Sequence, residues 1–381
     1  MTRERSTGSW RINLVVCAFG SFTTLVAMTM LIPLLPDFVR SLGVRSDSAV
    51  LHWSGYAYSA TFLTAALTAP VWGALGDRFG RRSMLLRASL GMALVTPLIG
   101  LSHAVWQLVL LRLLTGLMGG YSSGATILVA AQAPAERRGW ALGVLSSGIL
   151  AGSVAGPLIG GTLPALIGTG PTFIASGAVI FVAFLATLAF VRDVPDAGIS
   201  AAGRPVPASR SRGLPSGVPL LLATSTMLTF ALMSAEPIIT VYARQLGGGT
   251  HAAAWAGLAM ALAAGGSVAA APLAGRITDR RGAHAVIAGS LAAGTLLLAA
   301  QAAAPNPIVL CLLRLAQGVA LAGLTPAVAA AIRQRTPSDR VGRVLGLNVS
   351  AAYVGQIVGP VLGAQVGGSW GYGRCSSRPR W

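Results

Sequence analysis

The chain has 381 residues, of which 54% are hydrophobic and only 10% are charged. Because about 25% of the residues of a typical soluble domain are charged, this composition excludes an ordinary soluble protein and indicates an integral membrane protein. The net charge of +18 comes from arginines in short segments between apolar runs, a distribution typical of topology signals. We therefore expect the lipid bilayer as the surroundings of the chain, and no nucleic acid as a partner.

Six apolar stretches in the first half are each long enough to cross a bilayer as a helix, which takes about 20 residues. They lie at about 12–35, 51–75, 83–102, 104–132, 140–166 and 170–191. The first follows a short basic leader, is too long for the core of a cleaved signal peptide, and ends in Pro33 and Pro36. We interpret it as a retained span, so that residues 1–191 form an amino-terminal half of six helices.

A polar segment, 192–217, divides the chain, because it contains four arginines together with Pro, Gly and Ser residues typical of a flexible linker. Five more apolar stretches follow at about 218–242, 253–275, 283–303, 306–332 and 341–367. They predict a carboxyl-terminal half at 218–367, followed by an atypical polar tail at 368–381.

The second half repeats the first in a nearly constant register. Trp53, Gly55, Pro70, Asp77, Gly80, Arg112 and Gly116 recur 202 positions later, and Pro134, Gly139, Gly156 and Pro157 recur 203 positions later. This register extends over four spans and predicts two parallel structural repeats, with a substrate site between them.

The repeat also predicts a twelfth span that would begin near residue 374, as the counterpart of the sixth. The chain there reads RCSSRPRW and contains three arginines. Two interpretations stay open: a truncated or frame-shifted carboxyl terminus, and a genuine eleven-span product.

A charged hairpin, GALGDRFGRR, joins the second and third stretches and places its residues at a membrane face. Its glycines, with Gly76 between Gly73 and Gly80, permit a tight reversal and a close approach of the two helices. Its Asp77 can pair with a basic residue or cap a helix, unless the hairpin is only a topology signal made of arginines. The residues proposed to gate the protein are Gly73, Asp77, Arg78, Gly80, Arg81, Arg82 and the repeat residue Asp279, where the contact should be weaker because the second Gly-Arg-Arg is absent.

Small residues recur at a spacing of four in the fifth stretch, which favours close helix packing and a kink. They are Gly152, Gly156, Pro157, Gly160 and Gly161, and the Gly-Pro pair recurs at Gly359 and Pro360. Packing alone would explain the glycines, whereas the repeated pair favours two helices that rock at the interface of the halves.

Three motifs of the first half resemble signatures of the major facilitator superfamily. GALGDRFGRR resembles the family's loop between the second and third spans. RLLTGLMGG, which begins at Arg112, resembles the family's fourth-span motif, whose arginine is tied to proton coupling. GSVAGPLIGG, which begins at Gly152, resembles the family's fifth-span antiporter motif. The resemblance points to the twelve-span drug:proton antiporter group. It implies an all-α membrane protein of the major facilitator fold, with two parallel six-helix repeats, the second truncated to five helices.

In that fold the first, fourth, seventh and tenth spans line the cavity, which would bring four ionisable residues together: Asp37, Arg112, Glu236 and Arg314. A charged group is costly inside a bilayer, so each arginine should face a polar cavity, unless it reaches the outer interface by snorkelling. Two carboxylates beside two arginines can exchange a proton for a substrate. Glu236 is the preferred proton carrier, and Asp37 could instead be a solvated loop residue.

The predicted function is export of a small amphipathic compound in exchange for protons. The alternatives are import or export of one specific metabolite, and a transport-inactive, truncated membrane protein. No enzyme motif is found, and the four scattered histidines predict neither a metal site nor a cofactor.

The loop arginines predict the orientation, because those of the leader, the linker and the hairpins fall on one side, whereas the loops on the other side have Arg40, Arg45 and Arg244. With eleven spans, the three arginines of the tail would be an exception on that other side. We therefore expect a protein of the cell membrane with a cytoplasmic amino terminus. We also expect a monomer.

Overall fold

The computed structural model describes residues 4–192, 215–337 and 340–370 of the protein, so most of the expected linker and tail lies outside the described residues. Within those ranges every regular element is a helix, and nine segments are long and apolar enough to cross a membrane. One of the nine, Val218–Arg281, contains two expected spans. The second expected span is not among them, because its Ser, Thr, Tyr and Trp residues lower its mean hydropathy.

The chain divides into two compact units. Among the described residues, unit 1 comprises 4–31 and 60–192, and unit 2 comprises 32–59, 215–337 and 340–370. Two long helices, α1 (Glu4–Ser41) and α2 (Asp47–Phe79), each contribute one part to each unit. The end of α1 and the beginning of α2, which the sequence assigned to the amino-terminal half, therefore belong to unit 2.

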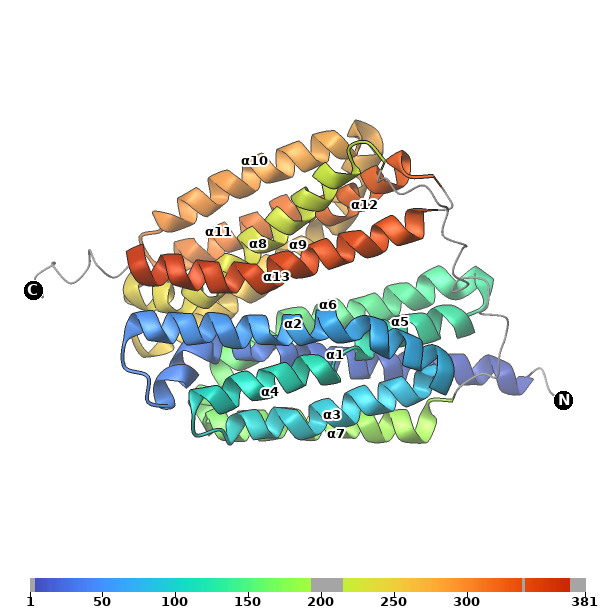
Figure 1. Ribbon diagram of the computed structural model, residues 1–381, viewed down its shortest axis with the longest axis horizontal. Coiled ribbons are helices and arrows are strands. Elements are labelled where there is room, and N and C mark those ends of the chain that lie inside the picture. Colours follow the sequence, from blue (N-terminus) through green and yellow to red (C-terminus); the bar gives the residue numbers. More distant parts are fainter. Residues whose placement is uncertain (1–3, 193–214, 338–339, 371–381) are drawn as a thin grey trace, which may run out of the picture. The chain divides into compact units, whose positions relative to one another are not determined.

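The other helices of unit 1 follow α2 in the chain. They are α3 (Arg81–Gly100), α4 (Val105–Met118), α5 (Tyr121–Gln132), the short η1 (Ala135–Arg137), α6 (Arg138–Ile167) and α7 (Thr169–Phe190). Helices α3 and α7 pack along each other (Figure 1). A buried cluster that includes Leu14, Leu85 and Tyr121 forms the core, where the Tyr121 hydroxyl lies 2.9 Å from the Thr187 hydroxyl.

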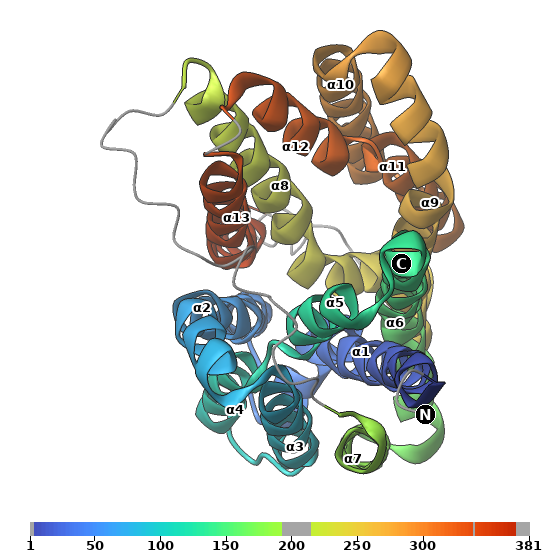
Figure 2. The ribbon, with the colours of Figure 1, turned by 90° about the vertical axis from the view of Figure 1, so that its right-hand side faces the viewer.

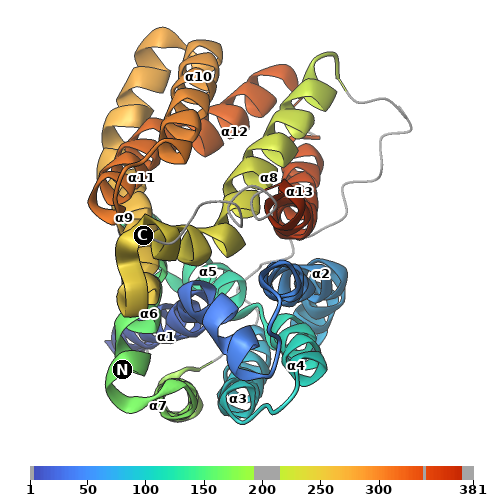
Figure 3. The same ribbon diagram turned by 90° about the vertical axis from the view of Figure 1, so that its left-hand side faces the viewer.

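Unit 2 contains α8 (Val218–Ala243), the short helices η3 (Arg244–Gly248) and η4 (Gly249–His251), α9 (Ala252–Arg281), α10 (Ala283–Ala302), α11 (Pro307–Leu321), α12 (Leu324–Arg335) and α13 (Val341–Trp370). Figures 2 and 3 show α13 beside α8 and α11 beside α9. The buried core includes Val218, Leu324 and Ile332.

Two expected spans differ from single straight helices. The fourth breaks into α4 and α5 at Gly119 and Gly120, where Gly120 has φ 102°, and the tenth breaks into α11 and α12 at the corresponding place. The first apolar stretch ends at Pro33 and Pro36, but the helix is longer than the stretch, because α1 continues through both prolines to Ser41. The Thr240 hydroxyl of α8 donates to the Pro33 carbonyl at 2.9 Å and supports α1 at this point.

The tight reversal predicted at the charged hairpin is confirmed. Gly80 joins α2 to α3 with φ 86° and ψ 154°, and its repeat Gly282 joins α9 to α10 with φ 81° and ψ 156°. This region of backbone conformation is accessible almost only to glycine. A Cβ added at Gly76 would lie 2.8 Å from a guanidinium nitrogen of Arg81, whereas one at Gly73 would meet nothing within 4 Å, so packing does not require a glycine there.

The small residues of α6 and α13 permit close helix packing, as predicted. A Cβ added at Gly152 would lie 2.6 Å from the Phe22 carbonyl of α1, and one added at Gly359 would lie 2.8 Å from the Phe230 carbonyl of α8. Gly156, Pro157, Gly160 and Gly161 are all buried. Each of these helices contacts the first helix of its own half, and a rocking motion at the interface of the halves stays a prediction.

Candidate functional site

A glutamate and an arginine meet in the interior of unit 2. Helix α8 carries Glu236 and α11 carries Arg314, with 3.7 Å between an Arg314 guanidinium nitrogen and a Glu236 carboxylate oxygen. Only 3% of the arginine side chain and 14% of the glutamate side chain are exposed. Because each charge is withdrawn from water, each depends on the other for compensation. Two of the four residues expected to meet therefore do so.

Two glutamines extend this polar cluster. Gln317 lies on α11 one turn after Arg314, and its side-chain oxygen accepts a hydrogen bond of 3.1 Å from the amide of Gln301 on α10. Both glutamines are buried. Arg314 Nε and Gln317 Nε2 have no acceptor among the described residues. The cluster therefore retains two buried donors that a bound molecule or water can satisfy.

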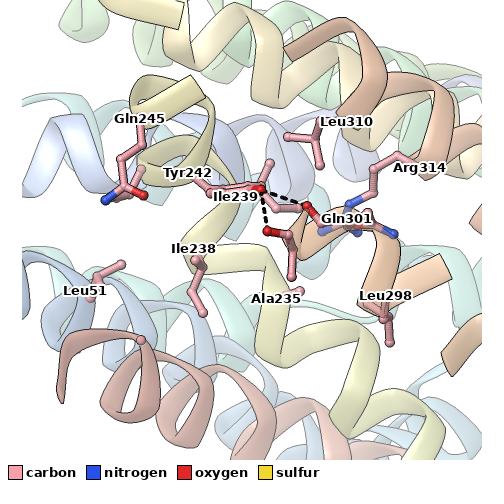
Figure 4. A pocket seen from close by; sticks show the side chains of 13 residues that line it. Leu51, Ala235, Ile238, Ile239, Tyr242, Gln245, Leu298, Gln301, Leu310 and Arg314 are labelled. Atoms are coloured by element: carbon pink, nitrogen blue, oxygen red, sulfur yellow. Dashed lines mark hydrogen bonds between the residues drawn. The ribbon is translucent and has the colours of Figure 1, made fainter. Parts of the chain in front are cut away.

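A cavity of about 390 Å³ opens beside the cluster. Figure 4 shows Arg314 and Gln301 on its wall together with Tyr242, whose hydroxyl donates to the Gln301 and Ala302 carbonyls at 2.8 and 3.2 Å. Most of the other lining residues are apolar, among them Leu51, Ile238, Ile239, Leu298 and Leu310. An apolar wall with a few convergent polar groups is typical of a small-molecule site.

Asp37 does not join this cluster. It lies within α1, so it is not a loop residue, and it forms an ion pair with Arg244, which directly follows α8. Both side chains are partly exposed, and a pair in contact with water contributes little stability. The expected grouping of Asp37 with Glu236 and Arg314 was therefore wrong, because a nearer arginine compensates its charge.

Arg112 lies on α4 in unit 1, at the position that Arg314 takes in the second repeat. The two arginine side chains are each 2% exposed, so these equivalent positions of the two repeats are also equally buried. This burial excludes the alternative in which Arg112 snorkels to the interface.

At the charged hairpin, Asp77 forms an ion pair with Arg81 across the reversal. Arg82 donates to the Leu188 carbonyl of α7 at 2.8 Å, and the Arg78 guanidinium lies 5.3 Å from the centre of the Phe79 ring. In the described part of the repeat, Asp279 forms no ion pair, because the counterpart of Arg81 is Ala283. The weaker contact expected there is thus observed, while its role in gating stays a prediction.

The sequence interpretation missed the role of Arg87, a partly buried arginine on α3. Arg87 of α3 lies 3.6 Å from the centre of the Trp72 ring and donates to the Leu117 and Gly119 carbonyls at 3.0 and 2.7 Å. It therefore caps the end of α4 at the break before α5. The available signal was that Arg87 is the only charge in the third apolar stretch.

Within the described ranges, no group of three His, Cys, Asp or Glu side chains is placed to hold a metal ion.

Comparison with known proteins assigns a family to this geometry. The family model described as Major Facilitator Superfamily matches residues 17–291 and 220–376. The chain is 36% identical over 367 residues to the Multidrug resistance protein MdtG of Rahnella sp. (strain Y9602), covering 96% of this chain and 89% of that protein. It is 38% identical over 368 residues to the protein of the same name from Dickeya zeae (strain Ech586), covering 95% and 90%.

Solved structures show the same fold at low sequence identity. A bacterial homolog of the human lysosomal transporter Spinster, inward-facing and occupied, has a TM-score of 0.75 at 19% identity and covers 94% of this chain and 82% of its own. A D-xylose-proton symporter has a TM-score of 0.70 at 17% identity and covers 95% and 92%. With its repeated halves, its signature hairpin and these matches, the chain belongs to the major facilitator superfamily, as an all-α, multi-pass membrane protein.

Proposed function

We propose that this protein exports drug-like amphipathic compounds in exchange for protons, with Glu236 as the proton site. The observation that carries the proposal is the buried Glu236–Arg314 pair beside an apolar cavity that is lined by Arg314, whose Nε has no acceptor among the described residues. The relatives named multidrug resistance proteins, which match nearly the whole chain, support the substrate class.

The pair gives the site two states. With Glu236 ionised, Arg314 is held by an opposite charge at 3.7 Å, and the cluster is neutral as a whole. When Glu236 takes up a proton, that attraction is lost and Arg314 becomes an uncompensated charge in the interior. Proton uptake and release therefore change the polarity of the cavity wall that a bound compound touches. Binding of the proton and binding of the compound are thereby linked.

The apolar wall favours a broad substrate range. Residues such as Leu298 and Leu310 contribute contacts that do not depend on orientation, whereas Arg314 and Gln301 offer polar groups that lie near each other (Figure 4). A site of this kind can bind compounds of different shapes that combine a large apolar part with one polar group.

We further propose that the protein lies in the cell membrane, with the amino terminus and the charged hairpins on the cytoplasmic side. The Asp77–Arg81 pair then lies at the cytoplasmic face, where its opening and closing would gate that side.

The test is drug flux in proteoliposomes that contain the purified protein. An imposed proton gradient should drive the drug against its own concentration gradient, and collapse of the proton gradient should stop it. Glu236→Gln, which keeps the shape but cannot ionise, should abolish gradient-driven flux. Drug moving together with protons would identify an importer, and no flux in the wild-type protein would support the transport-inactive alternative.

A further inference from the structure

Unit 2 has a second cavity, of about 330 Å³, between α9, α10 and α11. It shares no lining residue with the cavity at Arg314. Its wall is mostly small and apolar, with Ala274 on α9, Gly289 on α10 and Val319 on α11, and Arg281 lines it at the end of α9. Figures 2 and 3 show these three helices gathered in one part of unit 2.

The internal repeat shows what fills the corresponding place in unit 1. The counterparts of Ala274 and Gly289, 202 positions earlier, are Trp72 and Arg87. These two side chains stack on each other, and both donate to the Leu117 carbonyl of α4, Trp72 at 2.9 Å and Arg87 at 3.0 Å. The space between three helices is thus closed by protein in unit 1.

In unit 2 the same space is open, because a Trp and an Arg are replaced by Ala and Gly. A Cβ added at Gly289 would meet nothing within 4 Å, so the backbone has not moved in to close the gap. Apolar cavities do not retain water, and one of about 150 Å³ is already large enough to take up an apolar ligand. An apolar molecule is therefore the expected occupant.

The third difference between the repeats is a charge. Arg281 takes the place of Phe79, so a cation appears at the rim of the cavity in the unit where the cavity is open. Arg281 forms no ion pair or hydrogen bond with another side chain in the described ranges. It is the last residue of α9, and we expect this end of the helix at a membrane face.

The cavity opens toward the surroundings of the helices. Leu273 and Ile277 of α9 line it and are themselves 61% and 38% exposed, so the cavity opens through an apolar surface of α9, the kind of surface that lipid chains cover in a membrane protein. A ligand that enters from the bilayer therefore needs an apolar chain, and to reach Arg281 it needs an anionic group at the level of the head groups.

We propose that this cavity binds an anionic glycerophospholipid, with an acyl chain between Ala274 and Gly289 and the phosphate on Arg281. The lipid replaces the packing that Trp72 and Arg87 supply in unit 1. Basic pockets between membrane helices are known to hold anionic head groups. The proposal does not depend on the transported substrate or on proton coupling.

The test is native mass spectrometry of the purified full-length protein titrated with phosphatidylglycerol and, separately, with phosphatidylcholine. Phosphatidylglycerol should bind about fivefold to tenfold more tightly, because its head group has a net negative charge, whereas the choline cation of phosphatidylcholine offsets the charge of its phosphate. Arg281→Gln should remove this preference, and the matched change Arg280→Gln, whose side chain does not line the cavity, should leave it intact.

A second variant tests the cavity itself. Gly289→Phe should fill it and weaken binding of both lipids, while Gly265→Phe on α9, also open to a Cβ but outside the lining, should not. If Gly289→Phe does not fold, Ala274→Leu replaces it as the variant that fills the cavity. The proposal would be overturned by equal affinity for the two lipids, or by a preference for phosphatidylglycerol that persists in Arg281→Gln. It would also be overturned if the protein formed a dimer that Gly289→Phe dissociates, because a second copy of the protein would then occupy the cavity.

Discussion

The Glu236–Arg314 pair shows how strongly two residues in this protein depend on each other. Both side chains are nearly removed from solvent and lie on helices that are distant in sequence. Removing one partner leaves the other as an uncompensated buried charge, whereas removing both leaves only an apolar contact.

Arg314→Met should therefore destabilise the protein by roughly 3–5 kcal/mol, and the double variant with Glu236→Met should regain most of that loss. The measurement is unfolding in mixed micelles, compared across the four proteins of a double-mutant cycle. Additive effects of the two single changes would mean that the residues do not interact.

Part of this site could be predicted from the sequence. Glu236 and Arg314 stand out because a charge in an apolar stretch needs a partner or a function. The choice of partners could not be predicted, since it depends on which helix ends lie together, and Asp37 pairs with Arg244 for that reason. The amides Gln301 and Gln317 carry no net charge and gave no comparable signal.

At the scale of the helices, glycine marks the places where two backbones approach each other. In α6, Gly152 faces the Phe22 carbonyl of α1, while Gly143 of the same helix has no neighbour within 4 Å of an added Cβ. The helix thus offers a test position and a control within three turns.

Gly152→Leu should reduce the stability of the protein by about 1–3 kcal/mol or more, because its side chain would force α6 away from α1. Gly143→Leu should have little effect. Thermal unfolding in detergent measures both, and equal effects of the two changes would show that the contact between α6 and α1 is not close.

A separate prediction concerns Gly80, at the reversal between α2 and α3. Gly80→Ala should cost about 1–3 kcal/mol, since alanine does not tolerate φ 86° with ψ 154°. Gly73→Ala should be neutral or slightly stabilising, because it lies inside α2 with open space around it. The same unfolding assay decides, and a larger loss at Gly73 than at Gly80 would contradict this assignment.

Helix positions followed from apolar runs, but their interruptions did not. The break before α5 arises at two consecutive glycines, of which Gly120 adopts φ 102°, whereas the prolines of α1 leave the helix continuous. A proline costs one backbone hydrogen bond, and neighbouring helices can compensate it. Local sequence therefore indicates where a helix can break, and tertiary contacts decide whether it does.

For the whole molecule, the repeat with an offset of 202 to 203 residues was the most informative sequence feature. It predicted the equivalence of Arg112 and Arg314, of Gly80 and Gly282, and of the glycines in α6 and α13. Where the repeats diverge, as at Trp72 and Ala274, only the structure shows that a cavity results. The substrate and its coupling to protons belong to this scale, because transport requires the complete protein.

The most direct test of the account is proton release from the purified protein when drug is added, measured with a pH indicator in weakly buffered detergent solution. We predict that the wild-type protein releases protons on drug binding, that Asp37→Asn does so equally, and that Glu236→Gln releases none. Undiminished release from Glu236→Gln, or no release from the wild-type protein, would contradict the assignment of Glu236 as the proton site.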